Sequence, residues 1–337
     1  MISTQRMQLK EGSLSVKDFK LPIVTTVVVF ITLAMIEVMV KKPLLFMDRL
    51  SPGAGWLQVI LVSGYAFVVA YNMQDPAKAA LWRRRTWLLF STVFFGQLLL
   101  GLFASPIFLM SGTLHLPIPA MIIAAPLYRG ELSMMPFLFL TTIILSGPAW
   151  CSHICYFGGI DALAATGKTV KTAVRNKFAI KHSILIAVIA ASLLLRLLDV
   201  PVLWAVPLAL GFGLGGVAVI YLFSRTQGRM VHCTMYCPIG TIVQYAKWIS
   251  PFRMHIEQDC SACGRCSNSC KYDALNREDI LKHKPGLSCT LCGDCITSCH
   301  SSSIQYKFFN FSSVFSRKVW LCISIALHAI TLTLARI

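Results

Sequence analysis

The sequence predicts a multi-span α-helical membrane protein that carries a small α+β module near its C-terminus. Three observations support this fold class. Hydrophobic residues make up 56% of the 337 residues, and charged residues only 13%. Apolar runs approaching the roughly 20 residues that cross a bilayer recur from Leu21 onward. Eight cysteines crowd between Cys260 and Cys299 in two copies of one spacing. The chain is therefore expected to combine a membrane part with a compact cysteine-rich segment.

The predicted elements follow the chain in order. We expect a polar tail at residues 1–20, a transmembrane helical domain at 21–250, the α+β module at 251–310 and a membrane or interfacial helix at 311–337. The spans are predicted at residues 21–40, 54–72, 87–110, 132–150, 181–198, 201–223 and 318–335. The first run lacks a small-residue cleavage motif, so we interpret it as a retained helix and not a signal peptide.

Residues 116–128 form an apolar segment of a different kind. The segment is too short to span a bilayer, and it carries Pro117 and Pro119. We expect a re-entrant or interfacial piece there.

Lys and Arg residues predict the orientation. They collect before residue 21, at 73–86 and at 151–180, in three connections that include Arg6, Lys10, Lys17, Lys20, Lys78, Arg83, Arg84, Arg85, Lys168, Lys171, Arg175 and Lys177. With seven spans, all three connections share one side with the cysteine-rich segment. The positive-inside rule makes that side cytoplasmic, in the inner membrane of a prokaryote.

The formal charge of +17 does not indicate a nucleic-acid partner. Residues 253–307 are near neutral, so we attribute the basic excess to membrane flanks facing lipid headgroups. The cytoplasmic placement also argues against disulfides among the thirteen cysteines.

The two cysteine motifs read CSACGRCSNSC and CTLCGDCITSC, and each is C-x2-C-x2-C-x3-C. In this pattern three thiolates bind one [4Fe-4S] cluster and the fourth binds the other cluster. The predicted module is therefore a ferredoxin-like 2[4Fe-4S] domain. Its first cluster takes Cys260, Cys263, Cys266 and Cys299, and its second takes Cys289, Cys292, Cys295 and Cys270. Paired zinc knuckles would leave two of the spacings unexplained. Lys271 and His300 stand where the bacterial pattern has proline.

Four further cysteines form two C-x3-C pairs, each at the cytoplasmic end of a predicted span: Cys151 and Cys155, then Cys233 and Cys237. Each pair is followed three residues later by glycine, Gly158 or Gly240. We interpret this as an internal repeat. Cysteines four apart lie on one face of a helical turn, so two turns could present four thiolates to one centre. Pro238 predicts that the second turn ends there.

Three interpretations of these four cysteines remain open. They could hold a third iron-sulfur or other metal centre that bridges the membrane to the ferredoxin-type clusters. They could be redox-active thiols or a copper or other metal reduction site, because thiolates near cations are reactive. They could also be structural cysteines, which are often buried.

Residues 132–307 resemble the NapH/NosR/CcoG group of membrane polyferredoxins, which also includes MauN. The resemblance is carried by the two C-x3-C pairs, one of them followed by Pro238, and then the two ferredoxin motifs. The first pair departs from the family pattern, since Tyr156 replaces proline. Without a large domain before the helices or after the module, the chain is most similar to the short NapH or MauN form. The resemblance implies electron transfer from quinol through ferredoxin partners, or copper handling as in CcoG-like members.

Few polar groups lie within the predicted spans: Glu37, Gln97 and Arg196, with Asp199 at an end. A quinone site needs an apolar slot and a polar group, for which Glu37, His153 and His232 are candidates. A bis-His haem would need His182 and His328. Cys322 is assigned to packing.

These features predict a membrane-bound electron-transfer subunit, not itself catalytic, that connects the quinone pool with a ferredoxin, cytochrome or reductase partner. The rival hypothesis is an assembly factor that reduces or passes on copper with its membrane-face thiols. A thiol-disulfide relay is a third hypothesis.

Overall fold

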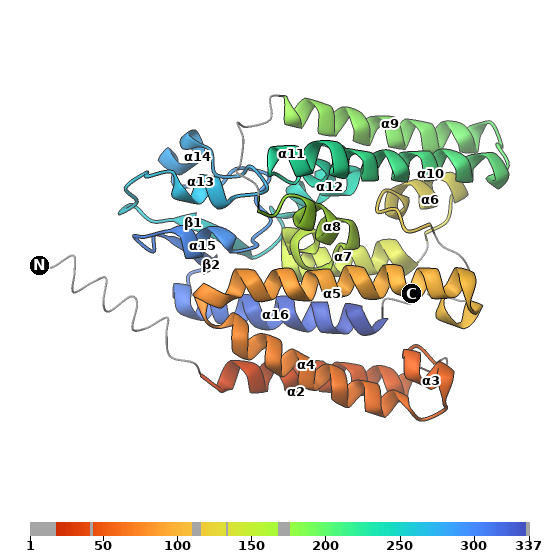
Figure 1. The fold of residues 1–337 in the computed structure, drawn as a ribbon, viewed down its shortest axis with the longest axis horizontal. Coiled ribbons are helices and arrows are strands. Elements are labelled where there is room, and N and C mark those ends of the chain that lie inside the picture. Colours follow the sequence, from red (N-terminus) through yellow and green to blue (C-terminus); the bar gives the residue numbers. More distant parts are fainter. Residues whose placement is uncertain (1–17, 41–42, 110–115, 133, 168–175, 335–337) are drawn as a thin grey trace, which may run out of the picture.

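Long helices run side by side, and the cysteine-rich region lies at one end of them (Figure 1). This computed structural model describes residues 18–40, 43–109, 116–132, 134–167 and 176–334. The predicted basic residues of the N-terminal tail up to Lys17, and also Lys168, Lys171 and Arg175, lie outside the described residues.

Seven of the described helical stretches are long and apolar enough to cross a membrane. They are Lys20–Met39, Gly55–Met73, Pro76–Phe103, Met135–Ile154, Lys177–Leu197, Val202–Gln227 and Ser313–Leu334. The helices within them are α2 (Lys20–Met39), α4 (Gly55–Met73), α5 (Pro76–Phe103), α7 (Met134–Ser146), α9 (Lys177–Leu197), α10 (Val202–Val219), α11 (Arg225–Gln227) and α16 (Ser313–Leu334). Seven such stretches are consistent with a multi-pass membrane protein.

The third span begins earlier than predicted. The sequence interpretation placed residues 73–86 in a basic loop, but α5 starts at Pro76 and carries Arg83 within it. The Asp75 carboxylate accepts a hydrogen bond from the backbone N–H of Ala77, and Pro76 suits the first helical position. These local signals start the helix well before its apolar part. The predicted loop was wrong.

The short apolar segment does not cross the bundle. Within residues 116–132, helix α6 (Met121–Arg129) has nine residues, and it packs against α9 and α7. Tyr128 donates a hydrogen bond to the carbonyl of Val200, 2.6 Å away, which fixes α6 against the end of α9. Short helix α3 (Phe46–Leu50) packs on α4.

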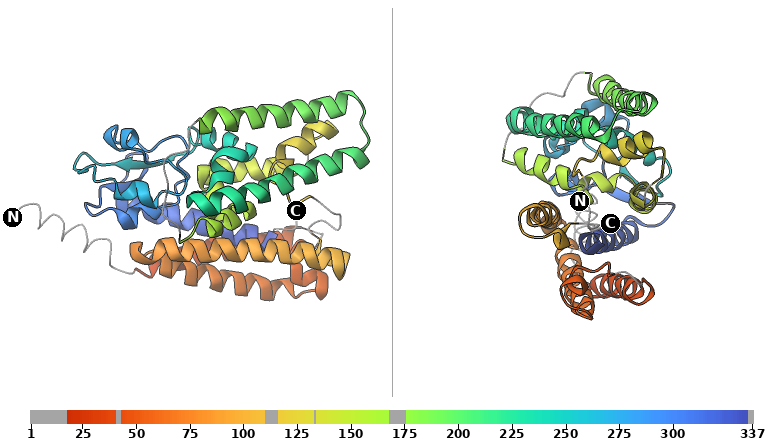
Figure 2. Two further views of the ribbon diagram at one scale, coloured as in Figure 1. Left: turned by 45° about the horizontal axis from the view of Figure 1, so that its top comes forward. Right: turned by 90° about the vertical axis from the view of Figure 1, so that its right-hand side faces the viewer.

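The first two spans pack against the last one. Their shared apolar core includes Val29 and Leu33 from α2, Val59 and Ala66 from α4, and Ile325 from α16. Seen end-on in Figure 2, α2 and α4 lie on the side of the molecule away from α9 and α10. The C-terminal helix is thus built into the bundle.

The cysteine-rich domain (residues 252–308) contains a two-stranded antiparallel sheet. Strand β1 (Phe252–Ile256) pairs with β2 (Ile304–Phe308), with Phe252 opposite Phe308 and Ile256 opposite Ile304. Three helices of five residues lie between the strands, α13 (Arg265–Ser269), α14 (Arg277–Leu281) and α15 (Asp294–Ser298). Trp320 of α16 belongs to the same apolar core, so the domain rests directly on the membrane helices.

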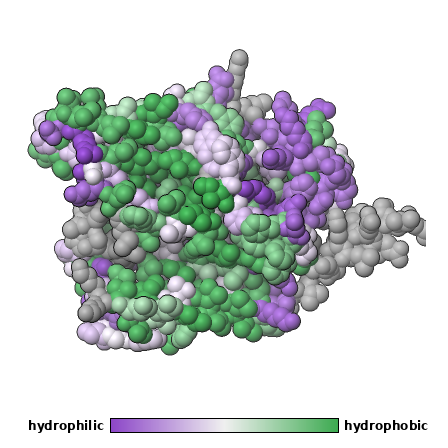
Figure 3. Space-filling view, turned by 180° about the vertical axis from the view of Figure 1, so that it is seen from behind, coloured by the Kyte–Doolittle hydropathy of each residue, from purple (hydrophilic) through white to green (hydrophobic). Residues whose placement is uncertain are grey.

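The surface separates into an apolar and a polar part. In Figure 3 hydrophobic residues cover the face of the helices, and hydrophilic residues gather over the cysteine-rich end. Large hydrophobic side chains of the helices are exposed, for example Leu197 at 79% and Leu203 at 78%. This separation fits a membrane-embedded bundle capped by a polar domain.

Candidate metal centres

The two cysteine motifs fold into the same loop. The residue before the second cysteine is left-handed in both, with φ of 51° at Ala262 and 58° at Leu291. The glycine after that cysteine, Gly264 or Gly293, is also left-handed and precedes a five-residue helix. Such backbone is rare outside glycine, and it curls each loop around the space beside its first three cysteines.

The fourth cysteine of each motif is followed by the same turn. Asp273 and Ser302, each three residues after that cysteine, have φ of 54° and 52°. Lys271 and His300, which replace the usual proline, therefore leave the two turns alike.

Each fourth cysteine lies beside the other motif. Cys260, Cys263, Cys266 and Cys299 line one cavity together with Ser261 and Gly264. Burial raises the pKa of Cys270 to about 12, and nearby Cys289 adds to the shift. Burial likewise raises the pKa of Cys292 to about 12, with Asp294 and Cys270 contributing. The thiols thus form the two groups that an exchange of fourth ligands requires.

Backbone N–H groups point at several of the sulfurs. The N–H of Ala274 donates to Sγ of Cys270 at 3.3 Å. A backbone hydrogen bond from Arg265 holds the pKa of Cys263 below its usual value. Donors of this kind stabilise thiolates, so the loops suit cluster ligation.

The two C-x3-C pairs have nearly identical backbones. A π-helical turn covers Trp150–Ile154 in the first repeat and His232–Tyr236 in the second. The N–H of Cys155 donates to the carbonyl of Trp150 at 3.0 Å, and that of Cys237 donates to the carbonyl of His232 at 2.9 Å. Both cysteines are extended, with ψ of 118° and 116°, and each precedes a helix of nine residues, α8 (Tyr156–Ala164) or α12 (Pro238–Ala246).

The structure refines two sequence expectations here. The turn that carries each pair is a wider π turn and not an α turn. As expected, the second turn ends before Pro238, which occupies the first position of α12. Tyr156 begins α8 in the same way, so the missing proline does not change the first repeat.

The glycine after each pair has a matching structural reason. A Cβ on Gly158 would lie 2.9 Å from the carbonyl oxygen of Cys151. A Cβ on Gly240 would lie 3.0 Å from the carbonyl oxygen of Cys233. Each glycine lets the helix after the pair approach the turn before it, which gives the internal repeat a geometric basis.

The four membrane-face cysteines gather together. Cys155 and Cys237 are buried in one apolar cluster, and Cys151 packs against it. Burial raises the pKa of Cys233, and Asp161 and the three other thiols add to the shift. Free thiols in such a place are poor nucleophiles, because little thiolate exists at neutral pH. The site therefore suits metal ligands better than an exposed reactive pair.

Asp161 joins the two repeats and was missed by the sequence interpretation. Its side chain is fully buried, and its Oδ2 accepts a hydrogen bond from the N–H of Cys233 at 3.0 Å. Burial raises the pKa of Asp161 to about 6. The lone acid within the apolar stretch YFGGIDALA was the available signal.

Tyr272 and Arg83 connect the membrane-face cysteines with the second motif. The Tyr272 hydroxyl donates to the carbonyl of Cys151 at 2.8 Å, and its ring lies in a buried cluster with Cys233. Arg83 donates to both carboxylate oxygens of Asp294, at 3.0 and 2.6 Å, and to the carbonyl of Ser152 at 2.9 Å. Because Cys270 and Cys292 pack against the Tyr272 cluster, the cysteine sets are neighbours.

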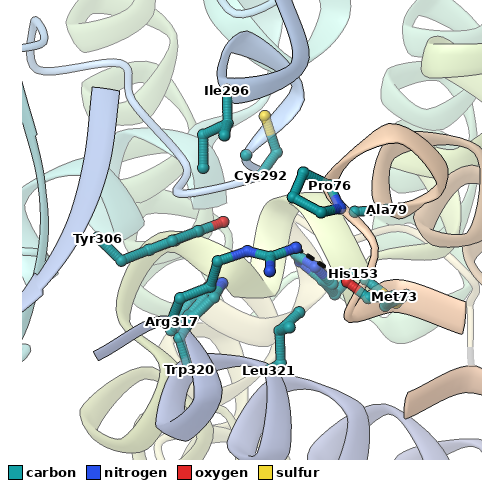
Figure 4. A pocket seen from close by; sticks show the side chains of 11 residues that line it. Met73, Pro76, Ala79, His153, Cys292, Ile296, Tyr306, Arg317, Trp320 and Leu321 are labelled. Atoms are coloured by element: carbon teal, nitrogen blue, oxygen red, sulfur yellow. Dashed lines mark hydrogen bonds between the residues drawn. The ribbon is translucent and has the colours of Figure 1, made fainter. Parts of the chain in front are cut away.

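A cavity at the same junction has Cys292 on one wall and His153 on another (Figure 4). Arg317 of α16 crosses it and donates to the carbonyls of Gln74 and Met73, at 2.7 and 3.0 Å. His153 is buried, and its Nδ1 hydrogen-bonds to Ser152 at 2.9 Å.

The remaining polar candidates lie in other places. Glu37 lies beside Asp48 of α3, a helix at the end of the bundle away from the cysteine-rich domain (Figure 1). His328 hydrogen-bonds to Tyr65 and to the His153 carbonyl through its two ring nitrogens, at 3.0 Å each. His182 is likewise bonded through both nitrogens, so neither imidazole is free for haem iron.

Gln97, Arg196, Asp199 and Cys322 lie away from the cysteine sets. Gln97 leaves its buried Oε1 without a hydrogen-bond partner, Arg196 lies against Gly130, and Asp199 adopts a left-handed backbone after α9. Cys322 packs against the core of α2, α4 and α16.

All thirteen cysteines lie within the described residues and are free thiols. Across the same part of the chain, no three Cys, His, Asp or Glu side chains converge as ligands of a single metal ion would. A [4Fe-4S] cluster takes one thiolate at each of several irons, so its ligands surround a space and not one atom.

A family model described as a 4Fe-4S binding domain matches residues 131–174 and 206–257. The two matched segments contain both C-x3-C pairs and end before Cys260. No curated protein and no solved structure matches the chain. The chain therefore carries a 4Fe-4S binding domain, and the match falls on the membrane-face repeats.

Proposed function

We propose that this protein is a membrane-bound iron-sulfur electron-transfer subunit, which passes electrons between the quinone pool and a partner oxidoreductase. The observation that carries the proposal is the continuity of the three cysteine sets. The four membrane-face cysteines adjoin the second motif through Tyr272, and the fourth cysteine of each motif lies beside the other motif.

The proposed ligands are the cysteines of these three sets. One ferredoxin-type cluster takes Cys260, Cys263, Cys266 and Cys299, the other takes Cys289, Cys292, Cys295 and Cys270, and a third centre takes Cys151, Cys155, Cys233 and Cys237. Iron-sulfur clusters supply one-electron redox capacity at these sites. The 4Fe-4S family match on the repeats supports iron at the third centre.

The surrounding residues keep water away and hold the domain in place. Three of the four membrane-face cysteines are buried. Asp273, itself buried, is ion-paired with Lys177 at 2.7 Å and with Arg229. A fixed, dry junction of this kind suits repeated electron transfer better than the release of copper to a partner.

We propose quinol as the membrane donor, because the buried thiol site lies at the ends of helices that face lipid. Oxidation of one quinol to quinone releases two electrons and two protons, and the electrons leave one at a time to one-electron carriers. The acceptor would be a ferredoxin, a cytochrome or a reductase subunit. In this role the chain would act like the short NapH or MauN relatives that it resembles.

Iron and acid-labile sulfide per chain test the ligand assignment, together with electron paramagnetic resonance of the reduced protein. Three cubanes predict about twelve irons per chain, and two predict about eight. The double variant Cys233→Ser, Cys237→Ser should lose about four irons, whereas the matched control Cys322→Ser should lose none. Colourless protein that contains zinc would contradict the proposal.

Reduction by a quinol analogue tests the donor. Anaerobic addition of duroquinol to the oxidised protein should bleach its visible absorbance, and dithionite defines full reduction. If duroquinol bleaches nothing that dithionite can bleach, the quinone pool is not the donor. Copper binding that is lost in the double variant, without redox subunits co-purifying, would support the assembly-factor hypothesis instead.

A further inference from the structure

Lys181 is a buried cation on a helix that otherwise presents apolar side chains to the surface. It lies in α9, within a candidate membrane span, and is only 4% exposed. Ile186 and Leu194 of the same helix are exposed. A charged side chain inside a span is costly, and it usually faces the interior of the bundle because it serves a function there. The inward position of Lys181 therefore calls for an explanation.

No acidic side chain of the described residues is ion-paired with Lys181. Its ammonium donates a hydrogen bond to Oε1 of Gln244 at 3.3 Å, which is a neutral partner. Lys177, one turn earlier on α9, is by contrast ion-paired with Asp273 at 2.7 Å. A buried charge needs a counter-charge to offset its lost hydration. For Lys181 this counter-charge must come from another kind of group.

The ammonium of Lys181 lies beside the membrane-face cysteines. Helix α9 packs against the second π turn and against α12. A Cβ on Gly240 would lie 3.3 Å from Nζ of Lys181, so the ammonium lies against the first turn of α12. It is close enough to interact electrostatically with the thiols of Cys151, Cys233 and Cys237. The cation therefore adjoins cysteines of both repeats.

The first repeat has a neutral residue at the matching place. A Cβ on Gly158 would meet the ring of Trp87 of α5. The Trp87 Nε1–H donates to the carbonyl of Cys155 at 2.7 Å. The two repeats thus share a backbone but differ in the side chain that covers the glycine. Because a neutral side chain serves the first repeat, the fold of the turn does not itself require a cation.

A bound cluster would supply the missing counter-charge. Neutral thiols offer none, whereas four thiolates on a [4Fe-4S] cluster give the centre a net negative charge. One-electron reduction adds a further negative charge to it. The reduction potential of such a cluster depends on its net charge and surroundings, so a buried cation nearby favours the reduced form.

We propose that Lys181 is the counter-charge of the third centre and raises its reduction potential. Lys181 is not a ligand, because Cys151, Cys155, Cys233 and Cys237 supply the four thiolates. Its fixed charge would make this centre easier to reduce. The inference rests on the proposed electron-transfer function and names the residue that sets how readily the third centre accepts an electron.

The test is a redox titration of the full chain in detergent, followed by electron paramagnetic resonance. The signal of the third centre is the one that the double variant Cys233→Ser, Cys237→Ser loses. Lys181→Met removes the charge, and Lys181→Gln removes it but keeps a hydrogen-bond donor. In both, the ratio of reduced to oxidised centre at the wild-type midpoint should fall at least tenfold, which is a downward shift of about 59 mV for one electron.

Two further variants separate charge from packing and position. Lys181→Arg keeps the charge, so its third centre should titrate close to the wild type. Lys247→Met is the matched control. Lys247 donates to the carbonyl of Gly286 at 2.9 Å and lies near Cys289 of the second motif. Its replacement should leave the potential of the third centre unchanged. Iron per chain shows which clusters each variant retains.

Two results overturn the inference: an unchanged potential in both neutral variants with full iron, or an equal fall in Lys181→Arg. If the neutral variants lose the iron of the third centre, Lys181→Arg decides, since retained iron supports the counter-charge and lost iron overturns it.

These failures differ from failure of the proposed function. If the double variant loses no iron relative to the wild type, the third centre is absent, and both the ligand assignment and the role of Lys181 fail. If the potential shifts as expected but duroquinol reduces no cluster, the role of Lys181 is supported and only the proposed donor fails.

Discussion

Arg83 shows what a single side chain does at the junction. The sequence interpretation assigned it to a basic membrane flank that needs no acidic partner. The structure instead buries it, at 3% exposed, where it joins Asp294 of the second motif to the carbonyl of Ser152. Sequence reasoning could not find this pair, because the partners are 211 residues apart and Arg83 stands within a run of three arginines.

Removing the Asp294 charge should destabilise the junction. In Asp294→Asn the buried Arg83 guanidinium loses its counter-charge, which typically costs about 3–5 kcal/mol for a buried pair and somewhat less here because Asp294 is 18% exposed. The midpoint of thermal unfolding in detergent should fall by several degrees, and iron should be lost more readily on dilution.

The matched control is Glu278→Gln, which breaks the exposed pair with Lys282. Those side chains are 85% and 72% exposed, so the change should be within about 0.5 kcal/mol. Equal unfolding midpoints for both variants would show that the Arg83 pair does not hold the domain.

At the scale of elements, the repeat of the C-x3-C pairs was predictable and its turn was not. The spacing of the cysteines and the glycine after each pair predicted two equivalent units, and both units have the same backbone conformation. The π turns could not be predicted, because three residues between two cysteines suit an α turn equally well. The early start of α5 could have been found from Asp75 and Pro76, a capping signal that precedes an arginine run.

The glycines after the pairs provide a test of the repeat. In Gly158→Ala and Gly240→Ala, the new methyl group would press on the carbonyl of the first cysteine of the pair, and in Gly158→Ala it would also meet the Trp87 ring. We expect about 1–3 kcal/mol of destabilisation and a loss of iron from the third centre in both variants. Iron analysis and unfolding midpoints measure the effect.

Gly211→Ala is the control for this pair of variants, because its Cβ meets nothing within 4 Å. It should match the wild type in iron content. Full iron in Gly158→Ala and Gly240→Ala would mean that the close approach of helix and turn is not needed.

At the scale of the molecule, hydropathy predicted where the long apolar helices lie in the sequence but not which of them pack together. All seven predicted spans overlap the seven stretches that could cross a membrane. Helix α16 packs against α2 and α4 through side chains such as Val59 and Ile325. Because these residues are far apart in the chain, no local sequence pattern predicts the contact. The same holds for Tyr272 in the candidate site, whose contact with Cys151 joins residues far apart in the chain.

The positive-inside rule predicts the side of the membrane. A site-specific protease sequence inserted after Leu281, which is 59% exposed, should be cut in inverted membrane vesicles and protected in right-side-out vesicles. The same insertion after Gly130 should behave oppositely, because α6 ends away from the cysteine-rich domain. Cleavage of the first site only in right-side-out vesicles would reverse the orientation.

Strand β2 ends at Phe308, and the last membrane helix begins five residues later at Ser313. At its other end the cysteine-rich domain follows α12 after only five intervening residues. Because both linkers are this short, the domain cannot move away from the helices to carry electrons between separate docking positions. Under the proposed function, we therefore expect a redox partner to dock on the domain itself, at the side of the first motif where Cys263 is exposed.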